Sequence, residues 1–319
     1  MNHEKVAILV DSGSDVPAEL LERYHIFMIP LKILFHEAEY LDGLTIDAGE
    51  VYRRLPTEVP KTSLPDGGLI TSVLDRIYQE GYRKVLAICI SGHLSGTCNL
   101  LRLLCDEYEG LECCVIDSKN ISIGSGILAI RCAQLLEEGM DFASLCQQAQ
   151  QMIGNSKIFF CLKTLEYLQK GGRIGKLAAM LGGAIALKPI ISCNEEGCYY
   201  PIAKTIGRAP SIRKVLELAQ KFAEGCPKVM LAVMHGGAPE EAQALAEEVR
   251  RRIPQGVIEV RGQISPALGV HTGPGLVGIC VLKMENISPV PFRLCPICAA
   301  GSGNAKRIAF HTAPVLLWS

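Results

Sequence analysis

Short apolar segments alternate with helical patterns through the first half of the chain, and this alternation restricts the possible folds more than any single motif does. The predicted strands, each ending on turn-forming or polar residues, are Val6–Val10, Ile26–Ile29, Lys84–Ile90, Glu112–Ile116 and Lys157–Cys161. Residues 141–153 follow a helical period, with apolar side chains on one face behind Asp141, which is suited to capping a helix. Strands joined by helices predict an α/β fold with a largely parallel sheet flanked by helices.

The second half of the chain repeats the alternation more loosely. Helices are predicted near Ile212–Phe222 and Pro239–Ile253, and strands near Val229–Met234 and Leu276–Leu282. Because 319 residues are enough for two cores, we expect an N-terminal α/β domain at 1–158 and a C-terminal α/β domain at 159–283. Residues 284–319 have scattered Pro and Gly, no sustained period and the only Trp, so they are predicted to form an atypical tail.

The loop Ser91–Thr97, SGHLSGT, follows a predicted buried strand and combines three hydroxyl side chains with two glycines and a histidine. Ligands of open parallel sheets bind beyond the carboxyl ends of the strands, where unpaired N–H groups favour an anion. A serine nucleophile is less well supported, because Ser95 lies one position late for a G-x-S-x-G elbow. Similar loops at 11–15, 61–65 and 117–122 are individually typical of caps and turns, but together they could converge at one sheet edge.

The sequence contains no intact nucleotide-binding loop. KGGRIGKL, which begins at Lys170, lacks the first Gly and the Ser or Thr of a P-loop. GSGILA at Gly124–Ala129 lies too far from the preceding strand for a dinucleotide turn. CPIC at Cys295–Cys298 lacks the second ligand pair of a zinc site. We therefore expect no metal and no cofactor.

Composition narrows the class of protein further. Acidic and basic residues nearly balance, 33 against 32, which argues against a nucleic-acid partner. The apolar run before Asp11 is too short for a signal peptide, and Leu177–Leu187 falls short of the roughly 20 residues of a membrane span. Most cysteines lie in apolar segments, as free thiols in a reducing compartment do. These features predict a soluble cytoplasmic protein without a membrane span.

Seven motifs then occur together: DSGSDVP, KTSLP, SGHLSGT, VIDSKNISIGSG, LEYLQKGGRIGKL, LKPIIS and HTGPG. In this order and at about this spacing, from about residue 5 to 283, they resemble the DegV family of fatty-acid-binding proteins. The resemblance implies a two-domain α/β protein that encloses one long-chain fatty acid. The family includes the acyl-binding subunits of bacterial fatty-acid kinases, which present the bound carboxylate to a separate kinase catalytic subunit for conversion to acyl-phosphate.

The resemblance also implies roles for four residues. Thr62 of KTSLP and Ser95 of SGHLSGT would hydrogen-bond the carboxylate of the fatty acid. Arg173 of KGGRIG and His271 of VHTGPG would lie at the mouth of the pocket, where a phosphate or the kinase is met. No catalytic residue is implied, so the chain would be a lipid-binding carrier and not an enzyme by itself. The tail beyond Lys283 departs from the family's usual ending.

Three classes of function remain open on the residues themselves. The first is a non-catalytic carrier of fatty acids, in which neutral hydroxyls and N–H groups hold the carboxylate. The second is an acyl hydrolase or transferase that uses Ser95, which would need a base within hydrogen-bond reach. The third is a binding module in which the lipid only fills the core. Residues 177–191, LAAMLGGAIALKPII, could line a tunnel or form an ordinary core helix.

Overall fold

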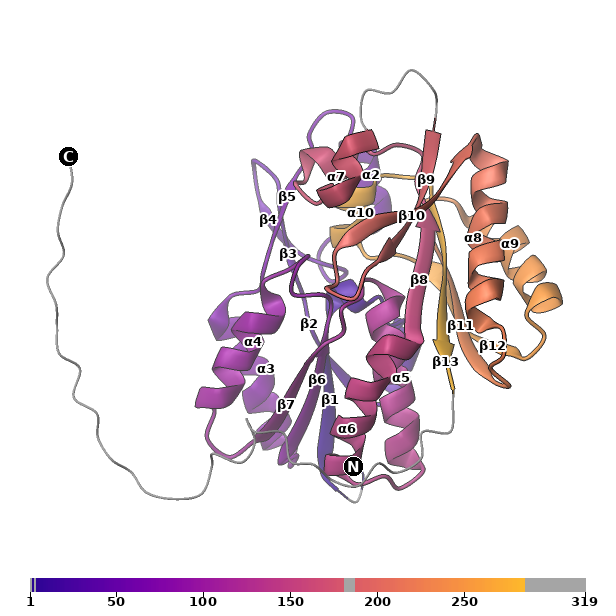
Figure 1. Ribbon diagram of the computed structural model, residues 1–319. Helices are drawn as coiled ribbons and strands as arrows, with labels where there is room; N and C mark the ends of the chain where they lie inside the picture. The colour runs from indigo at the N-terminus through magenta and orange to yellow at the C-terminus, as the bar shows by residue number, and fades with distance from the viewer. Residues whose placement is uncertain (1, 3, 181–186, 285–319) are drawn as a thin grey trace, which may run out of the picture. The chain divides into compact units, whose positions relative to one another are not determined.

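The computed structural model of the chain describes residues 2, 4–180 and 187–284. Four parallel strands form its first sheet, in the order β2-β1-β6-β7 (Figure 1). They are β1 Val6–Asp11, β2 Ile26–Ile29, β6 Lys84–Cys89 and β7 Glu112–Asp117. β1 is buried along its whole length and β6 at all but its first residue, which explains their continuous apolar sequences. The predicted parallel sheet is confirmed.

Helices cover both faces of this sheet, as predicted. The helices packed around this sheet are α1 Ala18–Arg23, α3 Gly67–Gln79, α4 Thr97–Glu107, α5 Ile123–Glu137 and α6 Phe142–Met152. α3 and α4 share one core with the sheet, which includes Leu9, Ile70 and Leu101. α5 packs on the opposite face. The helix predicted at 141–153 is α6, and Asp141 caps it by accepting the backbone N–H of Ser144 at 3.0 Å.

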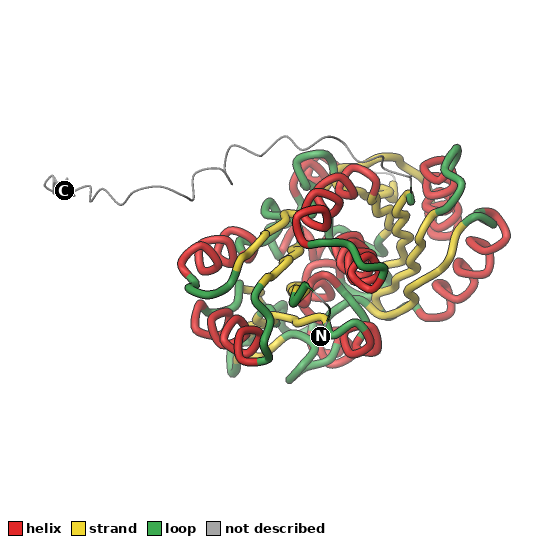
Figure 2. Tube along the Cα trace, turned by 90° about the horizontal axis from the view of Figure 1, so that it is seen from below, coloured by secondary structure: helices red, strands yellow, loops and turns green. Residues whose placement is uncertain are grey.

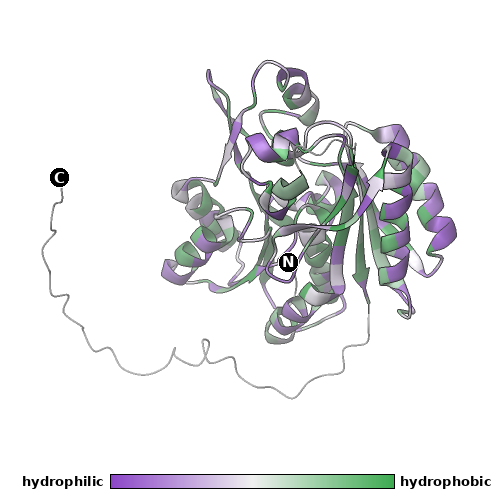
Figure 3. Cartoon of the chain, turned by 45° about the horizontal axis from the view of Figure 1, so that its top comes forward, coloured by the Kyte–Doolittle hydropathy of each residue, from purple (hydrophilic) through white to green (hydrophobic). Residues whose placement is uncertain are grey.

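The second sheet has six strands in the order β10-β9-β8-β13-β11-β12. Its strands are β8 Ser156–Cys161, β9 Leu187–Cys193, β10 Tyr199–Ile206, β11 Val229–Gly236, β12 Gly256–Gln263 and β13 Leu276–Lys283. Neighbouring strands are antiparallel except β11 and β12, which are parallel. α8 Arg208–Ala223 and α9 Pro239–Arg252 cover the outer face of the sheet. Figure 3 shows hydrophobic residues along these strands and hydrophilic residues on the outward surfaces of both helices.

α5 lies between the two sheets and packs against strands of both. Its residues are apolar nearly all round, as expected for a helix without a solvent-facing side. One core cluster therefore joins Ile8 of the first sheet, Ile127 of α5 and Phe160 of the second sheet. Figure 2 shows the resulting layers, with helices between the sheets and outside them.

The described residues, 2, 4–180 and 187–284, belong to one compact unit. The boundary predicted near residue 158 falls within β8, the first strand of the second sheet. The chain thus passes from one sheet to the other at this strand. One core cluster contains residues from both sides of this position. The division into two domains at residue 158 stays a prediction.

A third, small sheet was not expected from the sequence. It consists of three antiparallel strands of three residues each, β3 Lys32–Leu34, β4 Glu39–Leu41 and β5 Lys61–Ser63. Strands this short show no alternation that a sequence pattern could reveal. Four more short elements complete the helices: α2 Ala48–Arg54, α7 Glu166–Lys170, α10 Pro266–Thr272 and the 3-10 helix η3 Gly175–Met180. Two single 3-10 turns are η1 Ser12–Ser14 and η2 Ile153–Asn155.

The described residues of the segment 177–191 do not form the core helix that was one of its two interpretations. Its first residues belong to η3, and from Leu187 the chain is strand β9, which pairs with β8 and β10. Residues 181–186 of the segment lie outside the described residues. The core-helix interpretation is therefore wrong for the last part of the segment.

The predicted tail, from residue 285 on, and its CPIC motif lie outside the described residues. In the part of the chain that the structure describes, twelve cysteines are free, and most of them are buried. No helix in that part is long and apolar enough to cross a membrane.

Candidate functional site

A cavity of about 250 Å³ lies where the carboxyl ends of the parallel strands face the inner side of the second sheet. Loops after β6 and β7, strands β5, β8, β11 and β13, and helix α10 contribute to its wall. Its apolar lining side chains are Leu31, Leu64, Ile90, Leu94, Ile121, Ile158, Phe160, Met234, Ile264, Ala267, Leu268 and Leu276. Apolar walls with a few polar groups are typical of sites that take small, largely apolar molecules.

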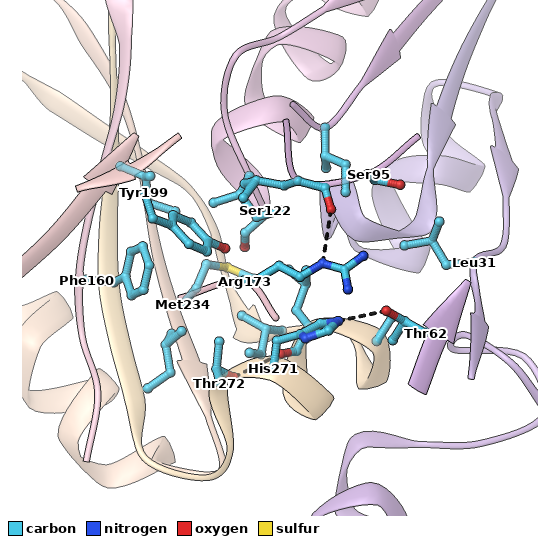
Figure 4. A pocket seen from close by; sticks show the side chains of 18 of the residues that line it. Leu31, Thr62, Ser95, Ser122, Phe160, Arg173, Tyr199, Met234, His271 and Thr272 are labelled. Atoms are coloured by element: carbon cyan, nitrogen blue, oxygen red, sulfur yellow. Dashed lines mark hydrogen bonds between the residues drawn. The ribbon is translucent and has the colours of Figure 1, made fainter. Parts of the chain in front are cut away.

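All four residues singled out from the sequence line this cavity (Figure 4). Thr62 comes from β5 and Ser95 from the loop before α4. Arg173 follows α7, and His271 lies in α10. These side chains are separated by up to 209 residues in sequence, yet the fold brings them to one cavity.

Thr62 and His271 are joined directly. Thr62 Oγ1 lies 2.7 Å from His271 Nε2, whereas the buried His271 Nδ1 has no hydrogen-bond partner. Burial, together with the nearby charge of Arg173, lowers the pKa of His271 to about 4, so the imidazole is neutral at pH 7. The ring of His271 can lie this close to the backbone at residue 171 because that residue is glycine: a Cβ there would lie 2.1 Å from His271 Nδ1.

Arg173 directs its guanidinium toward Thr62 and the loop that carries Ser95 (Figure 4). Its Nη1 donates to the carbonyl of Gly171 at 2.9 Å, and its Nε to the carbonyl of Leu94 at 3.4 Å. Among the described residues, no carboxylate pairs with Arg173. A half-buried cation without an acidic partner favours an anionic ligand beside it.

Ser95 has a local partner. Its hydroxyl lies 2.9 Å from Thr97 Oγ1 and accepts the backbone N–H of Thr97 at 3.3 Å. His271 is engaged by Thr62, and His93 is exposed to solvent, so neither histidine is hydrogen-bonded to Ser95. A serine nucleophile needs such a base, and the arrangement therefore does not support the hydrolase interpretation.

A groove on the surface adjoins the polar end of the cavity. Three residues line both the cavity and this groove: Thr62, Arg173 and His271. They therefore form the wall between the two spaces. The exposed Lys61 and Lys170 also line the groove, with Glu58 as its one acidic lining residue among those described. An anion held at this wall would be reached from outside through a basic surface.

Two buried carboxyl groups fix the beginning of α10 and hence the position of His271. Asp15 Oδ1 accepts the backbone N–H of Ser265, and Asp42 Oδ1 that of Ala267, each at 2.8 Å. Burial raises the pKa of Asp15 to about 8 and that of Asp42 to about 6. The sequence singled out residues 11–15 as a loop but gave no sign of this contact.

Three further lining residues were not predicted. Ser122 belongs to a hydroxyl loop noted in the sequence, and its hydroxyl donates to Asp15. Tyr199 and Phe160 lie in strands of the second sheet, where nothing in their sequence distinguishes a wall residue from a core residue. Of the tunnel wall expected at 177–191, residues 177–180 and 187–191 do not line the cavity, and residues 181–186 lie outside the described residues.

Comparisons with known proteins identify relatives along most of the chain. A family model described as "Uncharacterised protein, DegV family" matches residues 5–284. A DegV domain-containing protein of Clostridium acetobutylicum is 38% identical over 286 residues, which cover 88% of this chain and 99% of that protein.

Two solved structures are similar in fold. A fatty-acid-binding DegV family protein from Thermus thermophilus has a TM-score of 0.82 and 28% identity, over 89% of this chain and 100% of that chain. A stearic-acid-binding protein from Eubacterium ventriosum has a TM-score of 0.80 and 28% identity, over 86% of this chain and 97% of that chain. Both are named for binding a fatty acid.

Proposed function

The chain belongs to the DegV family, and from this membership and the polar end of its cavity we propose that it binds one long-chain fatty acid. The predicted resemblance to that family and the predicted α/β fold are confirmed. The observation that carries the proposal for this chain is Arg173, a cation with no described acidic partner at one end of an otherwise apolar cavity.

In this proposal Thr62 and Ser95 hydrogen-bond the carboxylate, and Arg173 provides the opposite charge nearby. Hydrogen bonds to a charged acceptor contribute about 1.5–3 kcal/mol each. They also let the carboxylate stay ionised next to apolar walls, because donors to the charged form offset the loss of hydration.

His271 acts through Thr62. Because the imidazole is neutral, it carries one N–H, and the proton is best placed on Nε2, the nitrogen that has a partner. Nε2–H then donates to Thr62 Oγ1, and the hydroxyl proton of Thr62 is free to point at the carboxylate. His271 is thus a positioning residue that orients the Thr62 hydroxyl.

The tail of the fatty acid occupies the apolar part of the cavity, among side chains such as Ile158, Phe160 and Met234. A chain with roughly 14 methylenes gains up to ~11 kcal/mol from burial at ~0.8 kcal/mol each, before ordering costs. Affinity therefore depends mainly on the tail, and the selection of an acid over a neutral lipid depends on the head group.

The chain does not modify the fatty acid by itself in this proposal. It presents the carboxylate at the wall formed by Thr62, Arg173 and His271, where a separate kinase catalytic subunit reaches it through the basic groove. That kinase would supply the nucleotide site and form the acyl-phosphate.

Mass spectrometry of lipid extracted from the purified protein tests the proposal. We expect about one long-chain fatty acid per chain, and saturable rebinding by delipidated protein in isothermal titration. Acyl-phosphate should form from the complex with ATP and magnesium only when a fatty-acid kinase is added. If the purified protein contains no fatty acid and the delipidated protein rebinds none, the binding function is refuted. Turnover without a kinase that is lost in Ser95→Ala would instead restore the hydrolase or transferase alternative.

A further inference from the structure

Six hydroxyl side chains line the cavity within the part of the chain that the structure describes. Five of them have a hydrogen-bond partner in the protein: Thr62, Ser63, Ser95, Ser122 and Thr272. Tyr199 is the exception, because its Oη forms no hydrogen bond. This hydroxyl is the one whose pairing the fold leaves open.

The setting of Tyr199 is fixed and apolar. Tyr199 is the first residue of β10 and only 6% exposed. Its ring packs edge-on against Phe160, with 5.7 Å between the ring centroids. Figure 4 shows Tyr199 beside Phe160 on the far side of Arg173 from Thr62, with its hydroxyl directed toward the centre of the cavity. The hydroxyl therefore lies along the part of the cavity assigned to the tail.

The Tyr199 hydroxyl faces the cavity without a partner in the protein, and Phe would fill the same space against Phe160 without placing a polar group there. Two other hydroxyls of the lining donate elsewhere: Ser122 to Asp15, and Thr272 to the carbonyl of Leu268 at 3.0 Å, and neither is hydrogen-bonded to Tyr199 Oη. An oxygen carried by an occupant of the cavity would supply the missing hydrogen bond.

We propose that the cavity is adapted to a long-chain fatty acid that carries a hydroxyl or keto oxygen on its chain, hydrogen-bonded to Tyr199 Oη. The inference rests on the proposed function, since it assumes the carboxylate at Thr62 and Arg173. A phenol can donate to either oxygen and can also accept from a hydroxyl, so both substituents satisfy it. An unsubstituted chain still binds, but it leaves Tyr199 unpaired.

The test compares stearic acid with 3-, 10- and 12-hydroxystearic acid and 10-ketostearic acid on delipidated full-length protein by isothermal titration. For each substituted acid, the measured quantity is the ratio of its affinity to that of stearic acid. For at least one positional isomer, we expect this ratio to be about tenfold higher in the wild type than in Tyr199→Phe, because the variant loses one hydrogen bond. Tyr200→Phe is the matched control, because Tyr200 is the next residue of β10 and does not line the cavity. It should leave every ratio unchanged.

The outcomes separate this inference from the function on which it rests. If stearic acid binds but no oxygenated isomer shows a ratio that depends on Tyr199, the inference is wrong and the binding function stands. An equal loss of stearic and substituted acids in Tyr199→Phe also overturns it, because the tyrosine would then serve the head group. If no acid binds to the wild type, the proposed function itself fails. A melting curve of Tyr199→Phe confirms that the variant is folded.

Discussion

Removal of one hydroxyl, in Thr62→Val, tests whether the cavity holds a carboxylate where the geometry places it. Valine has nearly the shape of threonine, so the change removes the hydroxyl and little else. If Thr62 donates to the carboxylate, the loss of this charge-assisted hydrogen bond costs about 1.5–3 kcal/mol, or about 10- to 150-fold in Kd. Thr62→Ser retains the hydroxyl and should stay close to the wild type.

The same substitution also affects the protein without ligand. Thr62 is the hydrogen-bond partner of His271 Nε2 at 2.7 Å, and His271 Nδ1 has none. Thr62→Val thus leaves both ring nitrogens of His271 without a partner in the protein, which we expect to lower the free energy of unfolding by about 1–3 kcal/mol. Affinity must therefore be measured per folded molecule, beside a denaturation curve.

A methyl ester of the same fatty acid separates the two effects. Isothermal titration of the acid and the ester into the wild type and Thr62→Val gives a double-mutant cycle in which the ester lacks the charged oxygen. We expect Thr62→Val to weaken binding of the acid by about 10- to 150-fold and binding of the ester much less. Equal losses for acid and ester, or no loss for either, would refute the reasoning that places the carboxylate at Thr62.

Three further predictions concern other parts of the site. Ser95→Ala should weaken fatty-acid binding about tenfold and also lower the melting temperature somewhat, because it removes the bonds to Thr97 Oγ1 at 2.9 Å and to the Thr97 N–H at 3.3 Å; lower stability at unchanged affinity would show a purely structural role. Arg173→Met should weaken binding of the acid and reduce its dependence on salt, whereas Lys170→Met, which removes an ammonium paired with a glutamate outside the cavity, should not. Burial raises the pKa of Asp15 to about 8, above the ordinary ~3.9, so the folded chain holds this proton more tightly than the unfolded chain. That stabilisation is complete below about pH 4 and lost as pH rises through 8, and urea titrations should show the decline flattened in Asp15→Asn.

The parallel sheet and its helices were predictable because their signal is local. Apolar runs such as residues 6–10 and 84–90 must be buried on both faces, and only a sheet covered by helices does this. The convergence of the hydroxyl loops followed from the same topology, since parallel strands direct their carboxyl ends to one edge. Ser95 lies in one of these loops, whereas the carboxylate-binding roles of Thr62 and Ser95 came from the family resemblance.

The remaining features depend on contacts between distant parts of the chain. The strand that carries Thr62 has three residues, too few for any periodicity, and it exists because it pairs with β3. The link between Thr62 and His271 spans 209 residues, and the contact of Asp15 with the start of α10 spans 250. Tyr199 follows a turn in a sequence typical of any sheet, so its place in the cavity wall became visible only in the fold.

The central claim is that a fatty-acid carboxylate is bound, ionised, beside Thr62 and Arg173. The carboxyl resonance of stearic acid labelled with carbon-13 at C1 measures this directly in the complex. The account predicts one bound resonance that keeps the shift of the ionised form from pH 7 to below about 4.3, the ordinary value for a side-chain carboxyl, because hydrogen bonds and Arg173 favour the charged form. In Arg173→Met the bound carboxyl should take up its proton at higher pH. A bound carboxyl that takes up its proton near pH 4.3 in both the wild type and Arg173→Met would contradict this claim. So would the absence of any bound resonance.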